Sequence, residues 1–133
     1  ITEEEALQKF TWLQNCSYSN ATFGICDGIL VFVKGRWFNG TWVHGYWLDG
    51  IWENGIWENG YWVNGVWHYG KWSCGIWESG IWLNGFWKDG LWKNGYWRNG
   101  LWEDGIWQNG EWKNGYWKGG TWIKGNRLNV VMQ

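Results

Sequence analysis

The stretch IWENGIWENGYWVNG, residues 51–65, consists of three consecutive copies of one five-residue unit. The same frame continues without insertion or deletion from residue 36 to residue 125, which makes eighteen copies. Eighteen of the 19 tryptophans and eighteen of the 22 glycines fall in this frame, so the composition follows from the repeat. A short and regular period of this kind is typical of a solenoid, in which each repeat packs on its neighbours.

Each unit predicts a three-residue strand followed by a corner. In an extended segment the tryptophan side chain points to one face and its two neighbours point to the other. Asn-Gly or Asp-Gly then turns the chain, because glycine readily takes the positive φ that such turns need. A helix is excluded, since a glycine at every fifth residue breaks it and a period of five does not match 3.6 residues per turn.

Two arrangements of the unit remain open. If each corner turns the chain by a right angle, four repeats close a coil of twenty residues, and about five coils stack into an all-β solenoid. If each Asn-Gly reverses the chain, the product is an antiparallel meander of three-residue strands with every tryptophan on one face. The residue after tryptophan favours the solenoid, because Val43, Val63, Leu83 and Ile123 share one column at a period of twenty, interrupted only by Glu103.

Over residues 31–130 this pattern resembles the pentapeptide-repeat family. The resemblance implies a right-handed quadrilateral β-helix, with the large central residue of each five pointing inward and a small residue two positions earlier. Trp52 and Trp57 match the central position, and Gly50 and Gly55 match the small one. The tryptophan-rich WxNG form also resembles repeats of predicted phage virion proteins and bacterial surface proteins.

We therefore expect one buried indole per repeat. The predicted core stack comprises Trp37, Trp42, Trp47, Trp52, Trp57, Trp62, Trp67, Trp72, Trp77, Trp82, Trp87, Trp92, Trp97, Trp102, Trp107, Trp112, Trp117 and Trp122.

The flanks of the repeat divide the chain into three predicted parts. Residues 1–28 form an N-terminal helix and capping segment, residues 29–130 form the tryptophan-rich solenoid, and residues 131–133 form a C-terminal tail. We expect a short helix over 2–15, then a polar loop through Asn20 and a strand in the apolar run ILVFV. Thr2 and Glu5 predict a capping box, and the buried stripe would contain Ala6, Leu7, Phe10 and either Leu13 or Trp12.

The three cysteines, Cys16, Cys26 and Cys74, lack the paired spacing of a zinc site. A disulfide between Cys16 and Cys26 and three small buried thiols are both compatible with the sequence. No metal or cofactor site is predicted.

The residue before tryptophan is the main anomaly. It should face outward, yet it is apolar or aromatic in thirteen of the eighteen copies. An isolated chain would expose columns of these residues, so we expect the outer faces to pack against other chains, either further copies or a larger assembly. The candidate interface residues, with three that follow tryptophan, are Tyr46, Ile51, Ile56, Tyr61, Ile76, Ile81, Phe86, Leu91, Tyr96, Leu101, Ile106, Val43, Val63 and Leu83.

Charge narrows the choice of partners. The net charge of −1 gives no reason to expect binding to nucleic acid or to an anionic membrane, and no apolar run is long enough to span a bilayer. Residues 46–85 carry four acidic residues against one basic residue, a balance of −3, whereas residues 86–125 carry four against six, a balance of +2. His44 and His68 occupy different repeat positions, and no catalytic constellation is present, so we do not expect an enzyme.

The expected function is a structural or assembly module of a virion, a tail or a surface fibre, which favours a virion or extracellular location. The alternative is a carbohydrate-binding or adhesive surface of stacked aromatic residues, because a rigid array of rings can bind the faces of sugars. A third and weaker interpretation is DNA mimicry by an acidic rod. The eight acidic and eight basic residues between positions 36 and 125 argue against it.

Overall fold

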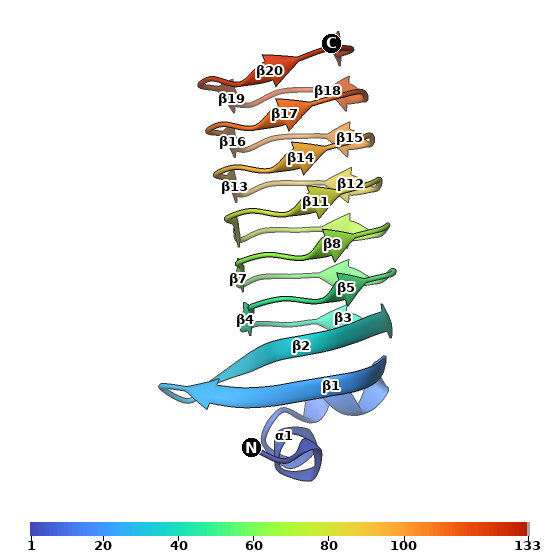
Figure 1. Ribbon diagram of the computed structural model, residues 1–133, viewed down its shortest axis with the longest axis vertical. Coiled ribbons are helices and arrows are strands. Elements are labelled where there is room, and N and C mark those ends of the chain that lie inside the picture. Colours follow the sequence, from blue (N-terminus) through green and yellow to red (C-terminus); the bar gives the residue numbers. More distant parts are fainter. Residues whose placement is uncertain (133) are drawn as a thin grey trace.

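The computed structural model describes residues 1–132 and shows a rod built of stacked coils (Figure 1). The rod is a parallel β-solenoid of about seven turns with one short α-helix at its N-terminal end. The predicted fold class, an all-β solenoid with a short N-terminal helix, is confirmed. Gln133, the last residue of the predicted tail, lies outside the described residues.

Every repeat contributes one short strand. The chain opens with α1 (Glu3–Lys9), the 3-10 helix η1 (Thr11–Asn15) and two long strands, β1 (Ser17–Cys26) and β2 (Ile29–Asn39). Two-residue strands follow: β3 (Thr41–Trp42), β4 (Tyr46–Trp47), β5 (Ile51–Trp52), β6 (Ile56–Trp57), β7 (Tyr61–Trp62), β8 (Val66–Trp67), β9 (Lys71–Trp72), β10 (Ile76–Trp77), β11 (Ile81–Trp82), β12 (Phe86–Trp87), β13 (Leu91–Trp92), β14 (Tyr96–Trp97), β15 (Leu101–Trp102), β16 (Ile106–Trp107), β17 (Glu111–Trp112), β18 (Tyr116–Trp117), β19 (Thr121–Trp122), β20 (Asn126–Arg127) and β21 (Val131–Met132).

Each coil has three sides. Trp52 pairs with Trp67 and Trp57 pairs with Trp72, so each strand lies parallel to the strand fifteen residues later. The predictions of four repeats per coil and of about five coils are therefore wrong. The antiparallel meander is also wrong, because only β1 and β2 pair in the antiparallel sense within the described residues.

Three flat faces result from this geometry. Face I contains the Arg36–Trp37 part of β2 followed by β5, β8, β11, β14, β17 and β20. Face II contains β3, β6, β9, β12, β15, β18 and β21. Face III contains the Val31–Phe32 part of β2 followed by β4, β7, β10, β13, β16 and β19.

The column at a period of twenty does not form. Val43 lies on face II, Val63 and Ile123 lie on face III, and Leu83 lies on face I, because they belong to repeats that follow Trp42, Trp62, Trp122 and Trp82. Their recurrence in the sequence therefore reflects no shared side of the rod.

The core is a triple stack of indole rings. Trp37 through Trp117 are at most 5% exposed in every repeat, and Trp122 in the last complete repeat is half-buried. Along the rod, the ring centroids of Trp52 and Trp67 are 4.7 Å apart with planes 4° from parallel. Within a coil, the rings of Trp52 and Trp57 meet edge to face at 6.0 Å and 71°. Three such edge-to-face rings fill the triangular cross-section, which accounts for three sides where four smaller central side chains would have been expected.

Glycine is required at the corners by close contact as well as by conformation. Gly80 has a φ of 123°, and a Cβ atom added there would lie 2.4 Å from the carbonyl oxygen of Gly65 in the preceding coil. That carbonyl accepts a hydrogen bond from the amide of Ile81 at 2.9 Å. The corner is therefore a place where two backbones touch, and a side chain has no room.

Asparagine and aspartate complete the corners. The side-chain Oδ1 of Asn84 accepts a hydrogen bond from the amide of Gly85 at 2.9 Å, and Asp89 does the same for Gly90 at 2.8 Å. These contacts satisfy glycine amides that would otherwise lack a partner at the turn.

The indole N–H groups are only partly satisfied. Trp92, Trp97 and Trp112 donate to the backbone carbonyl of the asparagine seventeen residues later, at 3.1 to 3.2 Å. Thirteen other buried indole N–H groups have no acceptor within residues 1–132. Ring packing is therefore the contact that all of these buried indoles share, whereas the hydrogen bond is made by three of them.

The N-terminal segment covers the first coil. The predicted capping box of Thr2 and Glu5 is confirmed. The helix is shorter than predicted, because the backbone of Phe10 leaves the helical region (φ −121°, ψ 78°) and the chain continues as η1. Ala6 and Leu13 are fully buried, whereas Leu7, Phe10 and Trp12 are partly buried against the core.

The segment predicted as a loop through Asn20 is instead the first part of β1. β1 runs antiparallel to β2, and the two join at Asp27 and Gly28, both of which have positive φ as in a tight hairpin. Phe23 meets Phe32 edge to face at 5.7 Å, and Tyr18 stacks on Trp37 at 6.1 Å. β1 therefore closes the end of the indole stack, as Figure 1 shows beneath β2.

The cysteines form no disulfide. Cys16, Cys26 and Cys74 are all free; Cys16 is half-buried and the other two are exposed. The Cys16 thiol contacts the carbonyl oxygens of Trp12 and Thr41 at 3.3 and 3.5 Å, and burial raises its pKa. The expectation of three buried thiols is therefore wrong for Cys26 and Cys74.

Tyr18 makes the stability of this cap pH-dependent. Burial, together with the negative charge of Glu3, to which its hydroxyl donates at 3.2 Å, raises the pKa of Tyr18 to about 12. The folded state favours the neutral phenol, so its stabilising contribution is present below the unfolded pKa of about 10 and is lost as pH rises towards 12. We expect the wild-type chain to lose more unfolding free energy than Tyr18→Phe between pH of about 9 and 11. Urea denaturation of both chains at the two pH values checks this, and an equal loss in the two would contradict it.

Candidate interaction surfaces

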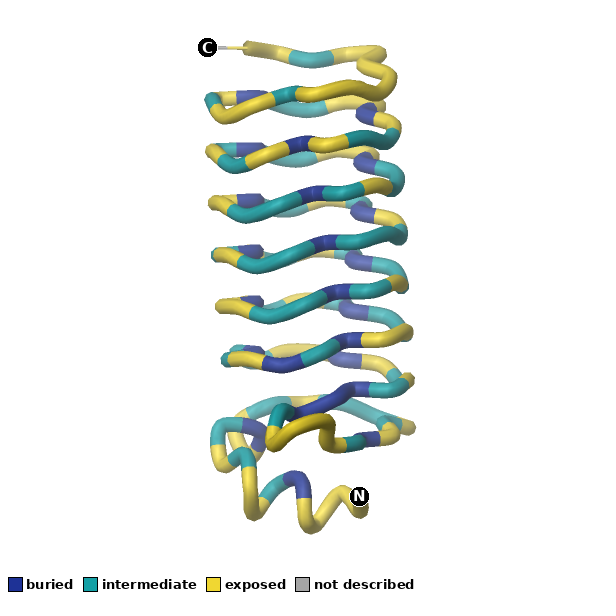
Figure 2. The backbone as a smooth tube through the Cα atoms, turned by 90° about the vertical axis from the view of Figure 1, so that its left-hand side faces the viewer, coloured by how far each residue is buried: buried dark blue, intermediate teal, exposed yellow. Residues whose placement is uncertain are grey.

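The outer surface of each face carries two columns of side chains. We call the residue before each tryptophan the leading residue and the one after it the trailing residue; both point away from the core while the tryptophan points into it. Figure 2 looks onto the side of the rod where face III lies, and the buried position recurs at the same place in successive coils. Leading residues such as Ile76 and Leu91 are half-buried, and Ile106 is 43% exposed.

Face III has the most apolar leading column. Its paired leading residues are Val31, Tyr46, Tyr61, Ile76, Leu91, Ile106 and Thr121. On face I the corresponding column begins with Arg36 and includes Glu111. On face II it is interrupted by Lys71. Among the described residues, face III alone therefore has a leading column without a charged side chain.

The trailing residues increase the difference in charge content between face III and the other two faces. On face III they are Val33, Leu48, Val63, Glu78, Lys93, Gln108 and Ile123. Two of the fourteen leading and trailing residues of face III are charged, namely Glu78 and Lys93. Among the corresponding described residues, faces I and II each carry five, if histidine is counted as neutral. The rod therefore has one face that is mainly apolar and two that are mixed.

The candidate interface residues are shared among the three faces. Face III carries Tyr46, Tyr61, Val63, Ile76, Leu91 and Ile106; face I carries Ile51, Ile81, Leu83 and Tyr96; face II carries Val43, Ile56, Phe86 and Leu101. The candidate interface residues predicted from the sequence did not include Leu48 or Ile123. These two residues extend face III and are 39% and 58% exposed. The signal that would have found them is the alignment of the sequence at a period of fifteen.

The two charges of face III lie next to each other in the ladder. The amide of Lys93 donates to the carbonyl of Trp77, which places it one coil beyond Glu78. The Glu78 carboxylate accepts a hydrogen bond from the hydroxyl of Tyr61, and the Lys93 ammonium lies 5.9 Å from the centre of the Tyr61 ring. Neither Glu78 nor Lys93 belongs to any ion pair found within the described part of the chain.

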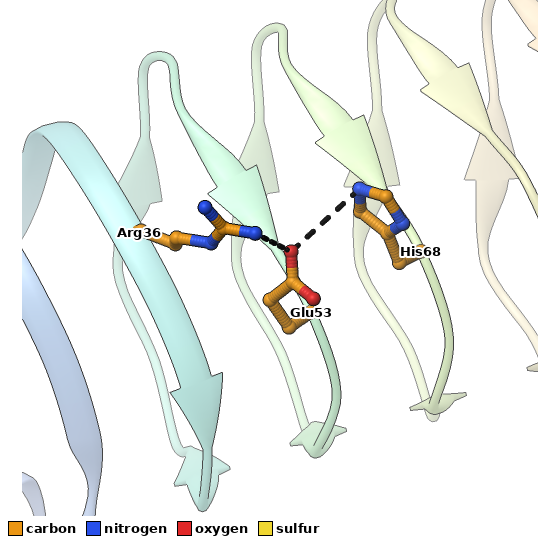
Figure 3. A network of polar contacts seen from close by, with 3 residues as sticks. All are labelled: Arg36, Glu53 and His68. Atoms are coloured by element: carbon orange, nitrogen blue, oxygen red, sulfur yellow. Dashed lines mark hydrogen bonds and ion pairs between the residues drawn. The ribbon is translucent and has the colours of Figure 1, made fainter.

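Face I carries a small polar network (Figure 3). The guanidinium of Arg36 donates to Glu53 at 2.7 Å, and Nε2 of His68 lies 3.7 Å from the same carboxylate oxygen. The Arg36 and His68 side chains are 49% and 43% exposed, so the pairs contribute at most about 1 kcal/mol each. This network is typical of a solvated surface rather than of a reactive site.

The remaining functional groups are dispersed. No group of three His, Cys, Asp or Glu side chains that could hold a metal ion occurs among the residues described. His44 follows Val43 at a corner of face II, whereas His68 is a trailing residue of face I. Within residues 1–132, no helix has the length and apolar character needed to cross a membrane.

Comparisons with protein-family models, with curated proteins and with solved structures gave no match to this chain.

Proposed function

We propose that the chain is a non-enzymatic structural or assembly module, a three-sided rod whose outer surface packs against other protein chains. The observation that carries this proposal is face III, where a column of aliphatic and aromatic leading residues runs along the rod and only Glu78 and Lys93 are charged among its leading and trailing residues. A surface of this kind is unfavourable in water unless a partner covers it.

The interior supports the same proposal. Indoles stacked at 4.7 to 5.2 Å along three columns, with a backbone ladder at every strand, give a rod with little freedom to bend. Such a rod suits a rigid part of a virion, a tail or a surface fibre. Its five-residue unit resembles that of the pentapeptide-repeat family, and we propose the chain as a three-sided, tryptophan-centred variant of that plan.

Carbohydrate binding is the second candidate. The indoles are in the interior, so this function would depend on the aromatic side chains outside. Tyr69 is 55% exposed and lines a shallow corner groove together with Phe86 and Lys71, which is the observation that favours it. DNA mimicry has no comparable support, since the net charge is only −1.

Sedimentation and electron microscopy of the purified chain test the proposed function. We expect the sedimentation coefficient to rise with protein concentration and the micrographs to show rods in contact along their sides or ends. A chain that sediments as a monomer up to near-millimolar concentration would contradict self-assembly. Protection of Tyr69 from iodination by a glycan would favour the carbohydrate-binding candidate instead.

A further inference from the structure

We infer that face III binds a second copy of this chain with the two rods antiparallel. The two-fold axis would lie in the interface and run along the strand direction. This inference rests on the proposed function, because it names the partner and the orientation for the apolar face.

The seven rungs of face III define the geometry. We number them by their trailing residues, from rung 1 to rung 7: Val33, Leu48, Val63, Glu78, Lys93, Gln108 and Ile123. Rung 1 belongs to β2, and its leading residue Val31 is already buried, with 8% exposure. Rungs 2 to 7 are therefore the part of the face that is free to bind.

A two-fold axis midway between rungs 4 and 5 makes these six rungs self-complementary. Such an axis reverses the rod direction but preserves the strand direction, so leading residues meet leading residues and trailing residues meet trailing residues. Rung 4 then faces rung 5, which places Glu78 opposite the partner's Lys93, and symmetry places Lys93 opposite the partner's Glu78. Both charges that lack an ion-pair partner within residues 1–132 thereby obtain one.

The other rungs meet without further charges under the same operation. Rung 3 faces rung 6, where Tyr61 meets the partner's Ile106 and Val63 meets the partner's Gln108. Rung 2 faces rung 7, which brings Leu48 to the partner's Ile123. In the leading column, Ile76 of rung 4 meets the partner's Leu91. Apolar side chains therefore cover apolar side chains in the trailing column of the outer rungs and in the leading column of the central rungs, which removes apolar surface from water.

A parallel dimer fails the same comparison. Its two-fold axis would run along the rod, so each leading residue would face the trailing residue of the same rung. Glu78 would then face the partner's Ile76, and Lys93 would face the partner's Leu91. Each charge would lose water without gaining a counter-charge from the partner, which is costly.

The charge of the whole rod also favours the antiparallel arrangement. The coils of residues 46–85 have a balance of −3 and those of residues 86–125 have a balance of +2. In the antiparallel dimer the acidic half of each rod lies beside the basic half of its partner, whereas the parallel dimer brings like charges together.

The size of the face sets the expected strength. Six rungs spaced at about 4.8 Å and strands about 10 Å across give a contact roughly 30 Å by 10 Å, below the size of standard protein interfaces. The dimer should therefore be weak and concentration-dependent, and more complete where many chains are held close together.

Charge reversal tests both the face and the orientation. We expect Glu78→Lys and Lys93→Glu each to weaken wild-type self-association at least tenfold in sedimentation equilibrium, because each places like charges in apposition twice per dimer. The double variant Glu78→Lys/Lys93→Glu should regain wild-type association. Glu58→Lys, on face II, is the matched control and should leave it unchanged. Near-ultraviolet circular dichroism of the indoles verifies that every variant is folded.

Mixing the two single variants gives a second, independent readout. The Glu78→Lys chain carries two lysines at the centre of face III, and the Lys93→Glu chain carries two glutamates there. In an equimolar mixture the two lysines of one chain lie opposite the two glutamates of the other, so a heterodimer should form.

Each outcome bears on a different part of the inference. Association that is insensitive to all of these substitutions would overturn the inference while leaving the proposed assembly function standing. Failure of both the double variant and the mixture to recover would overturn the antiparallel orientation. A wild-type chain that remains monomeric up to near-millimolar concentration would overturn this inference together with self-assembly as the form of the proposed function.

Discussion

Replacing Gly80 with alanine is expected to lower the free energy of unfolding by about 3 to 5 kcal/mol. Two causes add. The φ of 123° at this corner is one that residues with a Cβ rarely adopt, and the added Cβ would lie 2.4 Å from the carbonyl oxygen of Gly65 and 3.0 Å from its amide nitrogen. Backbone, unlike the end of a flexible side chain, cannot move aside without breaking the ladder bond from Ile81 to Gly65.

The chain supplies its own control in Gly119. It is a glycine of the repeat region that does not occupy the corner position, its φ is not in the positive range, and an added Cβ would have the Glu103 carbonyl oxygen as its nearest neighbour at 3.5 Å. Gly119→Ala should therefore change the free energy of unfolding by less than about 1 kcal/mol, with stabilisation the expected sign. Guanidinium denaturation followed by far-ultraviolet circular dichroism compares the two variants. Equal effects would refute the close-contact explanation of the corner glycines.

The solenoid itself could be predicted because the same five-residue pattern occurs eighteen times in the sequence. A tryptophan at the second position and a glycine at the fifth position of every unit allow only an extended segment and a turn. The inward position of the indoles follows from the same pattern. The helix cap could also be predicted, since Thr2 and Glu5 have the spacing of a capping box.

The number of sides could not be predicted from the same letters. The pattern of the five-residue unit is compatible with either three or four repeats per coil. The number of repeats depends on how edge-to-face indoles such as Trp52 and Trp57 fill the cross-section. The recurrence of Val43 and Val63 at a period of twenty was therefore misleading. At a period of fifteen, the charge-free column from Tyr46 to Thr121 becomes visible in the sequence.

The strand β1 was missed for a different reason. The segment Ser17–Cys26 is rich in small and polar residues, and only Phe23 is buried in it, so it has little of the apolar alternation that marks a strand. The local signal was the Asp27-Gly28 pair, a sequence typical of a two-residue hairpin turn. The partner that we propose for face III, by contrast, depends on which rungs meet, and this proposal required the coil register to be known.

Replacing Trp77 with alanine is expected to cost about 4 to 5 kcal/mol, the upper part of the range for removing a large buried ring. Trp77 stacks on Trp62 and Trp92 at 4.8 Å each. It also meets the rings of Trp72 and Trp82, its neighbours along the chain, edge to face. Neighbouring rings are themselves held in stacks, so the cavity cannot collapse. In a rod whose coils contact only their neighbours, such a gap also weakens the coupling between its two halves.

Trp122 is the matched control at the end of the stack. It is half-buried and stacks on one ring, Trp107, at 4.7 Å. It also meets Trp117 edge to face at 5.7 Å, and the Arg127 guanidinium lies 4.7 Å from its ring centre. Trp122→Ala should nevertheless cost less than about 2 kcal/mol, since the ring is half-buried and its removal leaves no enclosed cavity. Denaturation of both variants, followed by far-ultraviolet circular dichroism, measures the difference. Equal costs at the two positions would show that the stack does not act as a continuous core.

Trp77→Phe separates ring packing from the indole N–H. Phe32 already occupies the first rung of the same column, where it stacks on Trp47 at 4.0 Å with planes 4° from parallel, so a phenyl ring is compatible with the stack. The N–H of Trp77 has no acceptor within residues 1–132, and its loss removes no hydrogen bond. We expect Trp77→Phe to cost only about 1 to 2 kcal/mol, mainly through the lost ring volume. A cost as large as that of Trp77→Ala would contradict the expectation that a stacked ring without an N–H preserves the core at this position.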